Sequence, residues 1–292
     1  MIKRVIFLGT GPSSSLPNVH CITHKRDCKV CNDYVLNRDS KNVRGNISVL
    51  IQVLDEENRE KNILLDCGKT FYNSTLNHFT KNNIKHIDAV IITHGHADAM
   101  FGLDDLRPWC DVMESKTIPV YLNQETMNVA RSTFPYLVDT SKATGGGAVA
   151  KLDFNIINEY EPFSVFGVDI TPLPVEHGLY SDKITPYMCF AYKIDDICFV
   201  SDTNKISDQS REYMLNCNIL ILDLLKEEPY ASHFGMEQML KECELIQPKS
   251  CYTVGMAHQL DHYELEKRFS QISLENLFNL YPAFDGLILN ID

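Results

Sequence analysis

The sequence of 292 residues has no apolar run of about eighteen or more residues, the length that a helix needs to cross a bilayer. The opening residues "MIKRVIFLGTGPSSS" also lack the long hydrophobic segment and the small-residue cleavage site of a secretory signal. We therefore expect a cytoplasmic protein that does not interact with membranes. In a reducing compartment, clustered members of its ten cysteines favour metal binding over disulfides.

Basic residues are scarce, because 27 Lys and Arg face 39 Asp and Glu, for a formal net charge of −12. This balance disfavours nucleic acid as a partner, since that interaction needs concentrated positive charge. A small anionic substrate fits if a bound metal ion supplies positive charge locally. Internal repeats and low-complexity linkers are also missing, which predicts one domain over residues 1–292. A homodimer is compatible with the sequence.

Short runs rich in β-branched and aromatic residues predict strands along the whole chain. They are "RVIFLG", "ISVLIQVL", "NILLDCG", "AVIITH", "PVYL", "VDITPLPV", "CFAYKI", "ICFVSD", "NILILDLL" and "DGLILNI". Apolar residues three and four apart predict helices in "SDQSREYMLNC" and "GMEQMLKECELIQ". Early and late groups of strands with interspersed helices indicate an α/β (α+β) fold of two packed sheets flanked by helices.

The stretch "DAVIITHGHADAM", residues 88–100, places two histidines directly after a predicted buried strand. Spacing by two in extended backbone turns the imidazoles of His94 and His96 to the same side, and Asp98 continues that alternation. These residue types are zinc ligands, so the pattern favours a metal site over a polar strand end.

Further polar residues end other predicted strands: His177 in "LPVEHG", Asp202 in "CFVSD" and Asp66 in "LLDCG". Singly, each fits a turn or cap residue. Together with His94 and His96 they form a candidate ligand set, because strand ends can meet at one edge of a sheet.

The motifs "LLDCG", "THGHADA", "LPVEHG" and "FVSD" occur in the order of the metallo-β-lactamase superfamily, which the sequence resembles over nearly its whole length. The segments "FLGTGPSSSLPNVHC", "CKVC", "SKNVRGNISVLI", "GLDDLR", "SHFGMEQML" and "GMAHQLDH" are similar to the branch of phosphoribosyl 1,2-cyclic phosphate phosphodiesterases and their eukaryotic relatives. The resemblance implies a four-layer αββα sandwich with one or two metal ions at the sheet edge.

By the same resemblance, His94, His96 and His177 would bind a first metal ion, Asp202 would bridge to a second, and Asp98 would bind the second. The family pattern continues HxHxDH, but Ala99 stands at the last histidine, and Gly255 stands at another expected ligand of the second ion. His262, which lies nearby in the sequence, is an alternative ligand that could replace the missing histidine. We therefore expect one active-site ion, zinc or manganese.

The expected catalytic residues follow from this reduced ligand set. Asp98, if free of metal, would orient or deprotonate the attacking water. His233 in "SHFGMEQ" matches a later active-site histidine that would bind phosphate or protonate the leaving oxygen; a capping or buried histidine is the alternative. Asp66 is expected to hold a ligand histidine. For Arg107, an ion pair with Asp104 or Asp105 is favoured over phosphate binding.

A second metal site of another kind is implied near the N-terminus. Cys28 and Cys31 form a CxxC pair, which alone also fits a redox pair or chance. The related enzymes carry a structural zinc held by three N-terminal cysteines and a C-terminal histidine, and the matching residues are Cys21, Cys28, Cys31 and His258. Such a closed Cys₃His site would pin the N-terminal loop to the C-terminal segment. The other seven cysteines are predicted to be buried.

These features predict a metal-dependent hydrolase, a phosphodiesterase acting on a small cyclic or nucleotide-like phosphate. The alternative is a catalytically weakened relative that binds a nucleotide or phosphate ligand without efficient turnover, because two metal ligands are replaced. Processing of tRNA 3′ ends, known in the same superfamily, is disfavoured by the acidic charge. Hydrolysis of β-lactams is disfavoured by the missing secretion signal.

Overall fold

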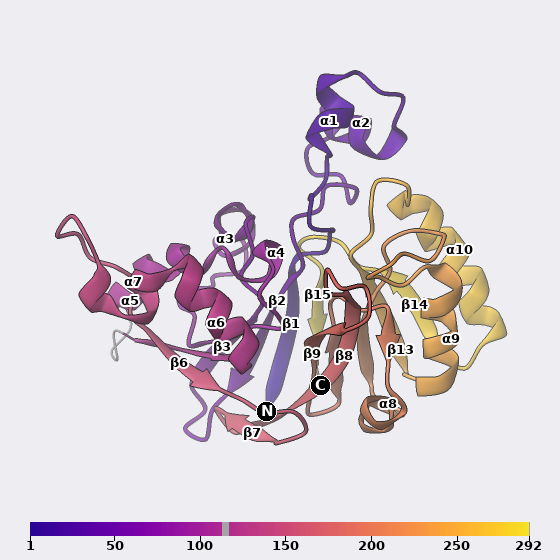
Figure 1. Cartoon of the computed structure of the whole chain (residues 1–292). Coiled ribbons are helices and arrows are strands. Elements are labelled where there is room, and N and C mark those ends of the chain that lie inside the picture. Colours follow the sequence, from indigo (N-terminus) through magenta and orange to yellow (C-terminus); the bar gives the residue numbers. More distant parts are fainter. Residues whose placement is uncertain (113–116, 292) are drawn as a thin grey trace.

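Two mixed sheets pack face to face and carry helices on their outer sides in the computed structural model, which describes residues 1–112 and 117–291 (Figure 1). The strand order is β15-β1-β2-β3-β4-β5-β6 in the first sheet and β11-β8-β9-β10-β12-β13-β14 in the second, where β7 pairs with β8. This arrangement confirms the predicted αββα sandwich.

The first sheet and its helices come mainly from the first half of the chain. Its strands are β1 (Ile2–Gly9), β2 (Ser48–Leu54), β3 (Glu60–Leu65), β4 (Ala89–Ile91), β5 (Ile118–Leu122), β6 (Leu152–Ile156) and β15 (Ile288–Asn290). The helices of this half are α1 (Val19–Thr23), α2 (Lys29–Leu36), α3 (Phe71–His78), α4 (Ala97–Met100), η1 (Leu103–Leu106), α5 (Arg107–Val112), α6 (Gln124–Thr133), α7 (Pro135–Val138) and η2 (Thr140–Lys142).

The second half forms the other sheet. Its strands are β7 (Phe163–Val165), β8 (Val168–Leu179), β9 (Pro186–Ile194), β10 (Ile197–Val200), β11 (Lys205–Ile206), β12 (Ile219–Asp223), β13 (Ser250–Val254) and β14 (Asn279–Pro282). Its helices are α8 (Asp208–Met214), α9 (Met236–Ile246) and α10 (His262–Glu275). The predicted strands and both predicted helices are present, whereas β6, β7, β11, β13 and β14 were not predicted.

Strands with two buried faces explain why the sequence shows nearly continuous apolar runs. In β1, Val5 and Phe7 face the second sheet, while Ile6 and Leu8 face the helices of their own half. None of the described helices combines the length and apolar character of a membrane span.

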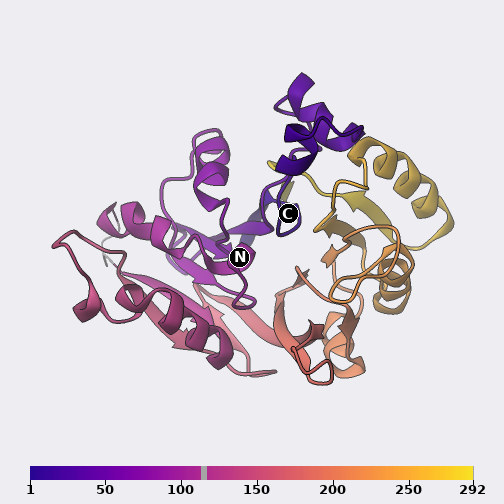
Figure 2. The same cartoon turned by 45° about the horizontal axis from the view of Figure 1, so that its top comes forward.

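Neighbouring parallel strands bring their carboxyl ends to one edge of each sheet. β3 pairs with β4 in the first sheet, and β10 pairs with β12 in the second. The short helices α1 and α2 extend away from the sandwich (Figures 1 and 2). Lys29 at the start of α2 forms an ion pair with Glu264 of α10. These two places, the sheet edge and the α2–α10 junction, hold the two predicted ligand sets.

Candidate metal-binding active site

The loop after β4 positions the first two histidines. His94 is buried at 1% exposure, and His96 is the exposed N-cap residue of the short helix α4. Their ring centroids lie 4.6 Å apart, as the predicted spacing requires. The loop therefore presents both imidazoles to the same region.

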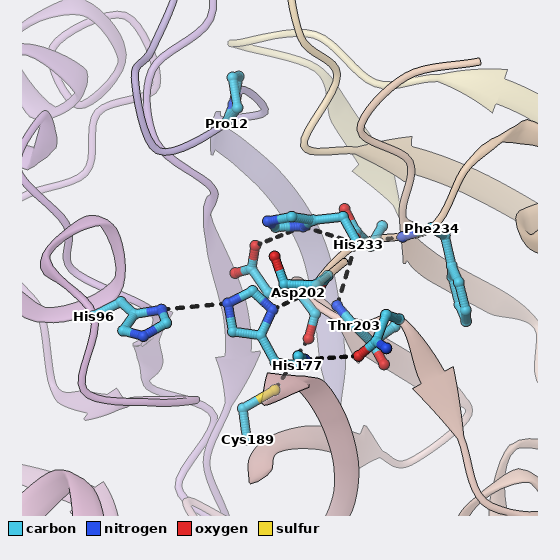
Figure 3. Close-up of polar contacts among 12 residues, drawn as sticks. Pro12, His96, His177, Cys189, Asp202, Thr203, His233 and Phe234 are labelled. Carbon is cyan, nitrogen blue, oxygen red and sulfur yellow. Dashed lines mark hydrogen bonds and ion pairs between the residues drawn. The ribbon is translucent and has the colours of Figure 1, made fainter. Parts of the chain in front are cut away.

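His177 joins them from β8 in the opposite sheet, between His96 and the pair Asp202 and His233 (Figure 3). Its Nε2 lies 3.3 Å from His96 Nδ1, and two nitrogens bound to one tetrahedral zinc ion at 2.0–2.1 Å would be about 3.3 Å apart. The buried Nε2 of His94 has no hydrogen-bond partner among the described residues. An uncompensated buried nitrogen is costly, so the three imidazoles fit a shared metal ion.

Hydrogen bonds fix the Nδ1 atoms of the two buried histidines. Thr93 Oγ1 donates to Asp66 at 2.9 Å and accepts the Nδ1 hydrogen of His94 at 2.8 Å. His177 Nδ1 donates to the Ser232 carbonyl at 2.8 Å. Burial lowers the pKa of His94 and lowers that of His177 to about 3, so both rings are neutral, as ligands must be. Asp66 thus orients a ligand histidine, His94, as expected, but it does so indirectly, through the hydroxyl group of Thr93.

Asp202 and His233 lie on the other side of His177. Asp202 follows β10, and together with His177 and His233 it offers ligand atoms within 4.8 Å of one another. His233 Nδ1 lies 3.5 Å from Asp202 Oδ1 and donates to Asp223 Oδ2 at 3.0 Å. Asp223, the last residue of β12, is fully buried and was not singled out from the sequence. Its position at the end of a predicted strand was the signal that could have found it.

These carboxylates control the charge of His233. Burial alone would lower its pKa, but Asp223, Asp202 and Asp98 raise it to about 9. Burial raises the pKa of Asp202 to about 7, although His233 opposes that rise. His233 is therefore protonated at neutral pH and can donate a proton or bind an anion.

Asp98 lies in α4 and is half-buried. Burial lowers the pKa of His96, and the charge of Asp98 opposes that shift without reversing it. Its carboxylate belongs to none of the three groups whose ligand atoms all lie within 4.8 Å of one another, as far as the chain is described. The structure thus brings together His94, His96, His177, Asp202 and His233, with Asp98 beside them.

Gly255 and Ala99 are the residues that, by the family resemblance, stand where ligands of a second ion were expected. Gly255 has φ +82°, and a Cβ placed there would lie 2.7 Å from Asp223 Oδ1. Ala99 is buried at 3% exposure. His262 offers no replacement, because its ring is buried against Phe284 and belongs to no ligand group among the described residues.

The four residues of the predicted structural zinc site also meet. His258 Nδ1 lies 3.2 Å from Cys21 Sγ, 3.5 Å from Cys28 Sγ and 3.7 Å from Cys31 Sγ. Nitrogen and sulfur ligands of one tetrahedral zinc ion would be about 3.6 Å apart, so this set could hold zinc. The remaining seven cysteines are buried, as predicted.

Arg107 differs from its expected role. Its Nη1 donates to the carbonyl of Ala148 at 3.1 Å, and no ion pair with Asp104 or Asp105 forms within the described parts of the chain. The guanidinium therefore ties α5 to the loop before β6 rather than pairing with the neighbouring acids.

Comparisons with known proteins agree with this geometry. The family model of the β-lactamase superfamily domain matches residues 61–256. A crystal structure described as a new diphosphatase from the PhnP family is 27% identical, covers 100% of this chain and 98% of its own, and superposes with a TM-score of 0.80. The zinc-bound PqqB of Methylobacterium extorquens is 17% identical with a TM-score of 0.74, over 99% of this chain and 100% of its own.

Two curated relatives match by sequence. An octanoyltransferase of Porphyromonas gingivalis is 26% identical over 98% of this chain, and the β-lactamase-like protein 2 homolog of Caenorhabditis elegans is 30% identical over 32% of it. The chain spans 51% of the length of the first and 32% of the second. With the family model covering most of the chain, the protein belongs to the metallo-β-lactamase superfamily.

Proposed function

We propose that this protein is a phosphodiesterase that hydrolyses a small cyclic or nucleotide-like phosphate with one active-site metal ion. The observation that carries the proposal is the convergence of three imidazoles on one point, with the buried Nε2 of His94 left without a partner among the described residues. The likeness to a PhnP-family diphosphatase supports phosphate as the substrate chemistry.

In this proposal His94, His96, His177 and Asp202 hold the ion, which is zinc or manganese. When bound, a divalent ion acts as a Lewis acid and lowers the pKa of water from about 15.7 to about 7. Thr93 and the Ser232 carbonyl keep the ligand nitrogens of His94 and His177 directed at the ion. The chain thus supplies an oriented set of neutral donors and one carboxylate.

His233 and Asp98 carry out the proton transfers. Asp223 holds His233 in its charged form, so His233 can bind the phosphate and then protonate the leaving oxygen. Asp98, half-buried and outside all three ligand groups of the described residues, accepts the proton of the attacking water.

A second candidate function is binding of a nucleotide or phosphate without efficient turnover. It is favoured by Ala99 and Gly255, which offer no side-chain ligands for a second ion. Without that ion, the paired stabilisation of attacking and leaving oxygens is lost. Calorimetry that detects ligand binding while phosphodiester hydrolysis is undetectable would identify this function.

The test of the proposed phosphodiesterase uses purified protein loaded with zinc or manganese and bis(p-nitrophenyl) phosphate. We expect slow metal-dependent release of nitrophenol, and His94→Ala should lose both the turnover and about one equivalent of metal. His24→Ala, which removes an exposed histidine outside both clusters, is the matched control and should retain both. A folded, metal-loaded protein without turnover would contradict the proposal.

We also propose that Cys21, Cys28, Cys31 and His258 bind a structural zinc ion. The sum of both sites predicts about two metal ions per chain in elemental analysis. A third equivalent would show that the site beside Ala99 and Gly255 binds a second active-site ion.

A further inference from the structure

A polar pocket of about 860 Å³ lies between α2 and α3, apart from both ligand clusters. Its walls come from the end of α2 and the following loop, the exposed side of α3, and the turn before β15. Volumes of about 300–1,000 Å³ are typical of small-molecule sites. The pocket is therefore large enough for a metabolite.

Two cations face this pocket without acidic partners among the described residues. Arg38 holds its guanidinium 5.3 Å from the centroid of the Tyr34 ring, and Lys81 follows α3 on the opposite wall. Neither forms an ion pair in the described ranges, although the chain carries 39 acidic residues. On a protein of net charge −12, such unpaired cations mark a local site for an anion.

Neutral donors complete the α3 wall. Asn73, Ser74 and Asn77 lie on one face of this helix because they are three and four residues apart. Ser74 is buried at 5% exposure. Its hydroxyl lies close to Gly45, because a Cβ added to that glycine would be 3.3 Å from it. No side-chain hydrogen bond of these three residues forms within the described chain, so their donors are available to a ligand.

Buried Arg44 gives the pocket a fixed wall. Its Nη1 and Nη2 donate to the carbonyls of Met256 and Leu260 at 2.8 and 3.0 Å, whereas its buried Nε has no partner among the described residues. The carboxylates of the pocket are Asp39 and Asp285, and Asp285 already accepts bonds from Gly45 N and Thr10 Oγ1. Arg44 adds a third positive charge to those of Arg38 and Lys81. These three cations outnumber the two carboxylates, so the pocket has a net positive charge.

We propose that this pocket binds a small soluble phosphate ester at a site separate from the histidine cluster. Phosphate oxygens accept hydrogen bonds from guanidinium, ammonium, amide and hydroxyl groups, which are the donors that the pocket offers. The fixed position of Arg44 and the helical spacing of the α3 donors limit the entropy lost when the ligand binds.

Calorimetric titration with glycerol 3-phosphate tests this site, with glycerol as the uncharged reference. We expect the wild type to bind the ester and not glycerol, and R38A/K81A to bind it at least tenfold more weakly. His94→Ala should keep the binding. R38A/K81A should keep the wild-type hydrolysis of bis(p-nitrophenyl) phosphate, because neither residue touches the histidine cluster.

The matched control is R131A/K85A, which removes the same charge from exposed positions outside the pocket and should bind like the wild type. Equal binding by R38A/K81A and the wild type, or loss of binding in His94→Ala, would overturn the proposal. So would an absence of binding to the wild type. Sedimentation with phosphatidylcholine vesicles containing phosphatidic acid, without binding of glycerol 3-phosphate, would assign the pocket to lipid headgroups and also overturn it.

Discussion

At the scale of single residues, the histidine cluster was more predictable than the groups that control it. His94, His96 and His177 are visible in the sequence because strand ends and a spacing of two suffice to place them. Asp223 was missed because its role depends on a contact with His233, which lies ten residues further along the chain, in the segment before α9. No local sequence pattern contains that contact.

The hydrogen bond between Asp223 and His233 leads to a pH-dependent prediction. Asp223 raises the pKa of His233, so Asp223→Asn should lower it from about 9 toward the ordinary value of 6.5 or below. If His233 acts as the acid, activity requires its protonated form and is lost as pH rises through its pKa. The basic limb of the pH–rate profile should therefore move to lower pH in Asp223→Asn.

Profiles of phosphodiester hydrolysis between pH 5 and about 10 measure this shift, and an NMR titration of the His233 ring gives a readout independent of activity. His233→Gln should remove the basic limb. An unchanged limb in Asp223→Asn, with metal content retained, would exclude His233 as the titrating acid.

Gly255 gives a prediction about stability. Gly255→Ala should lower the free energy of unfolding by about 1–3 kcal/mol, because the residue has φ +82° and the added Cβ would lie 2.7 Å from Asp223 Oδ1. Urea denaturation measures the change. Gly147→Ala, where a Cβ meets nothing within 4 Å, is the matched control and should stay within about 0.5 kcal/mol of the wild type.

At the scale of elements, the predicted strands were those with strong apolar runs, and the missed ones lack them. β13, "SCYTV", has polar residues among its apolar ones, and its neighbour β14 is the four-residue "NLYP". Both are strands because each has a parallel partner, β12 for β13 and β13 for β14. Tertiary pairing thus decides elements that local propensity leaves undetermined.

The anchoring of α2 can be tested at this scale. Cys28 is its N-cap residue and Cys31 lies in its first turn, so a zinc ion bound by them would join α2 to the segment that carries His258. Cys31→Ser should lower zinc content by about one equivalent and lower the melting temperature. The rate of amide hydrogen exchange should increase in α2 and stay unchanged in β4.

Cys189→Ser is the comparison, since Cys189 is buried in β9 and belongs to neither ligand cluster of the described chain. It should retain the full zinc content. Equal zinc content in Cys31→Ser and the wild type would contradict the assignment of Cys31 as a ligand.

At the scale of the whole molecule, the sandwich was predictable, while its single-domain organisation over residues 1–292 stays a prediction. The histidine cluster joins the two sheets, since His94 and His96 follow β4 and His177 lies in β8. An ion held there would stabilise the folded chain by about 2.7 kcal/mol at a free concentration one hundred times its dissociation constant. Substitution of a histidine from either sheet, such as His94 or His177, should remove this stabilisation by the ion.

Thermal unfolding of metal-free protein during zinc titration measures the stabilisation. Cys31→Ser should still show a rise in melting temperature from the histidine cluster, whereas His177→Ala should keep only the rise from the cysteine cluster. Loss of the whole rise in either single variant would show that the two sites are not independent.

The cysteine cluster has a consequence for how the protein is made. His258 follows its three cysteine partners by 227 to 237 residues. At a synthesis rate of about 5–20 residues per second, Cys21 would wait roughly 10–50 s for the fourth ligand to emerge. During that interval the three thiols lack their fourth partner and are open to oxidants and to competing metal ions.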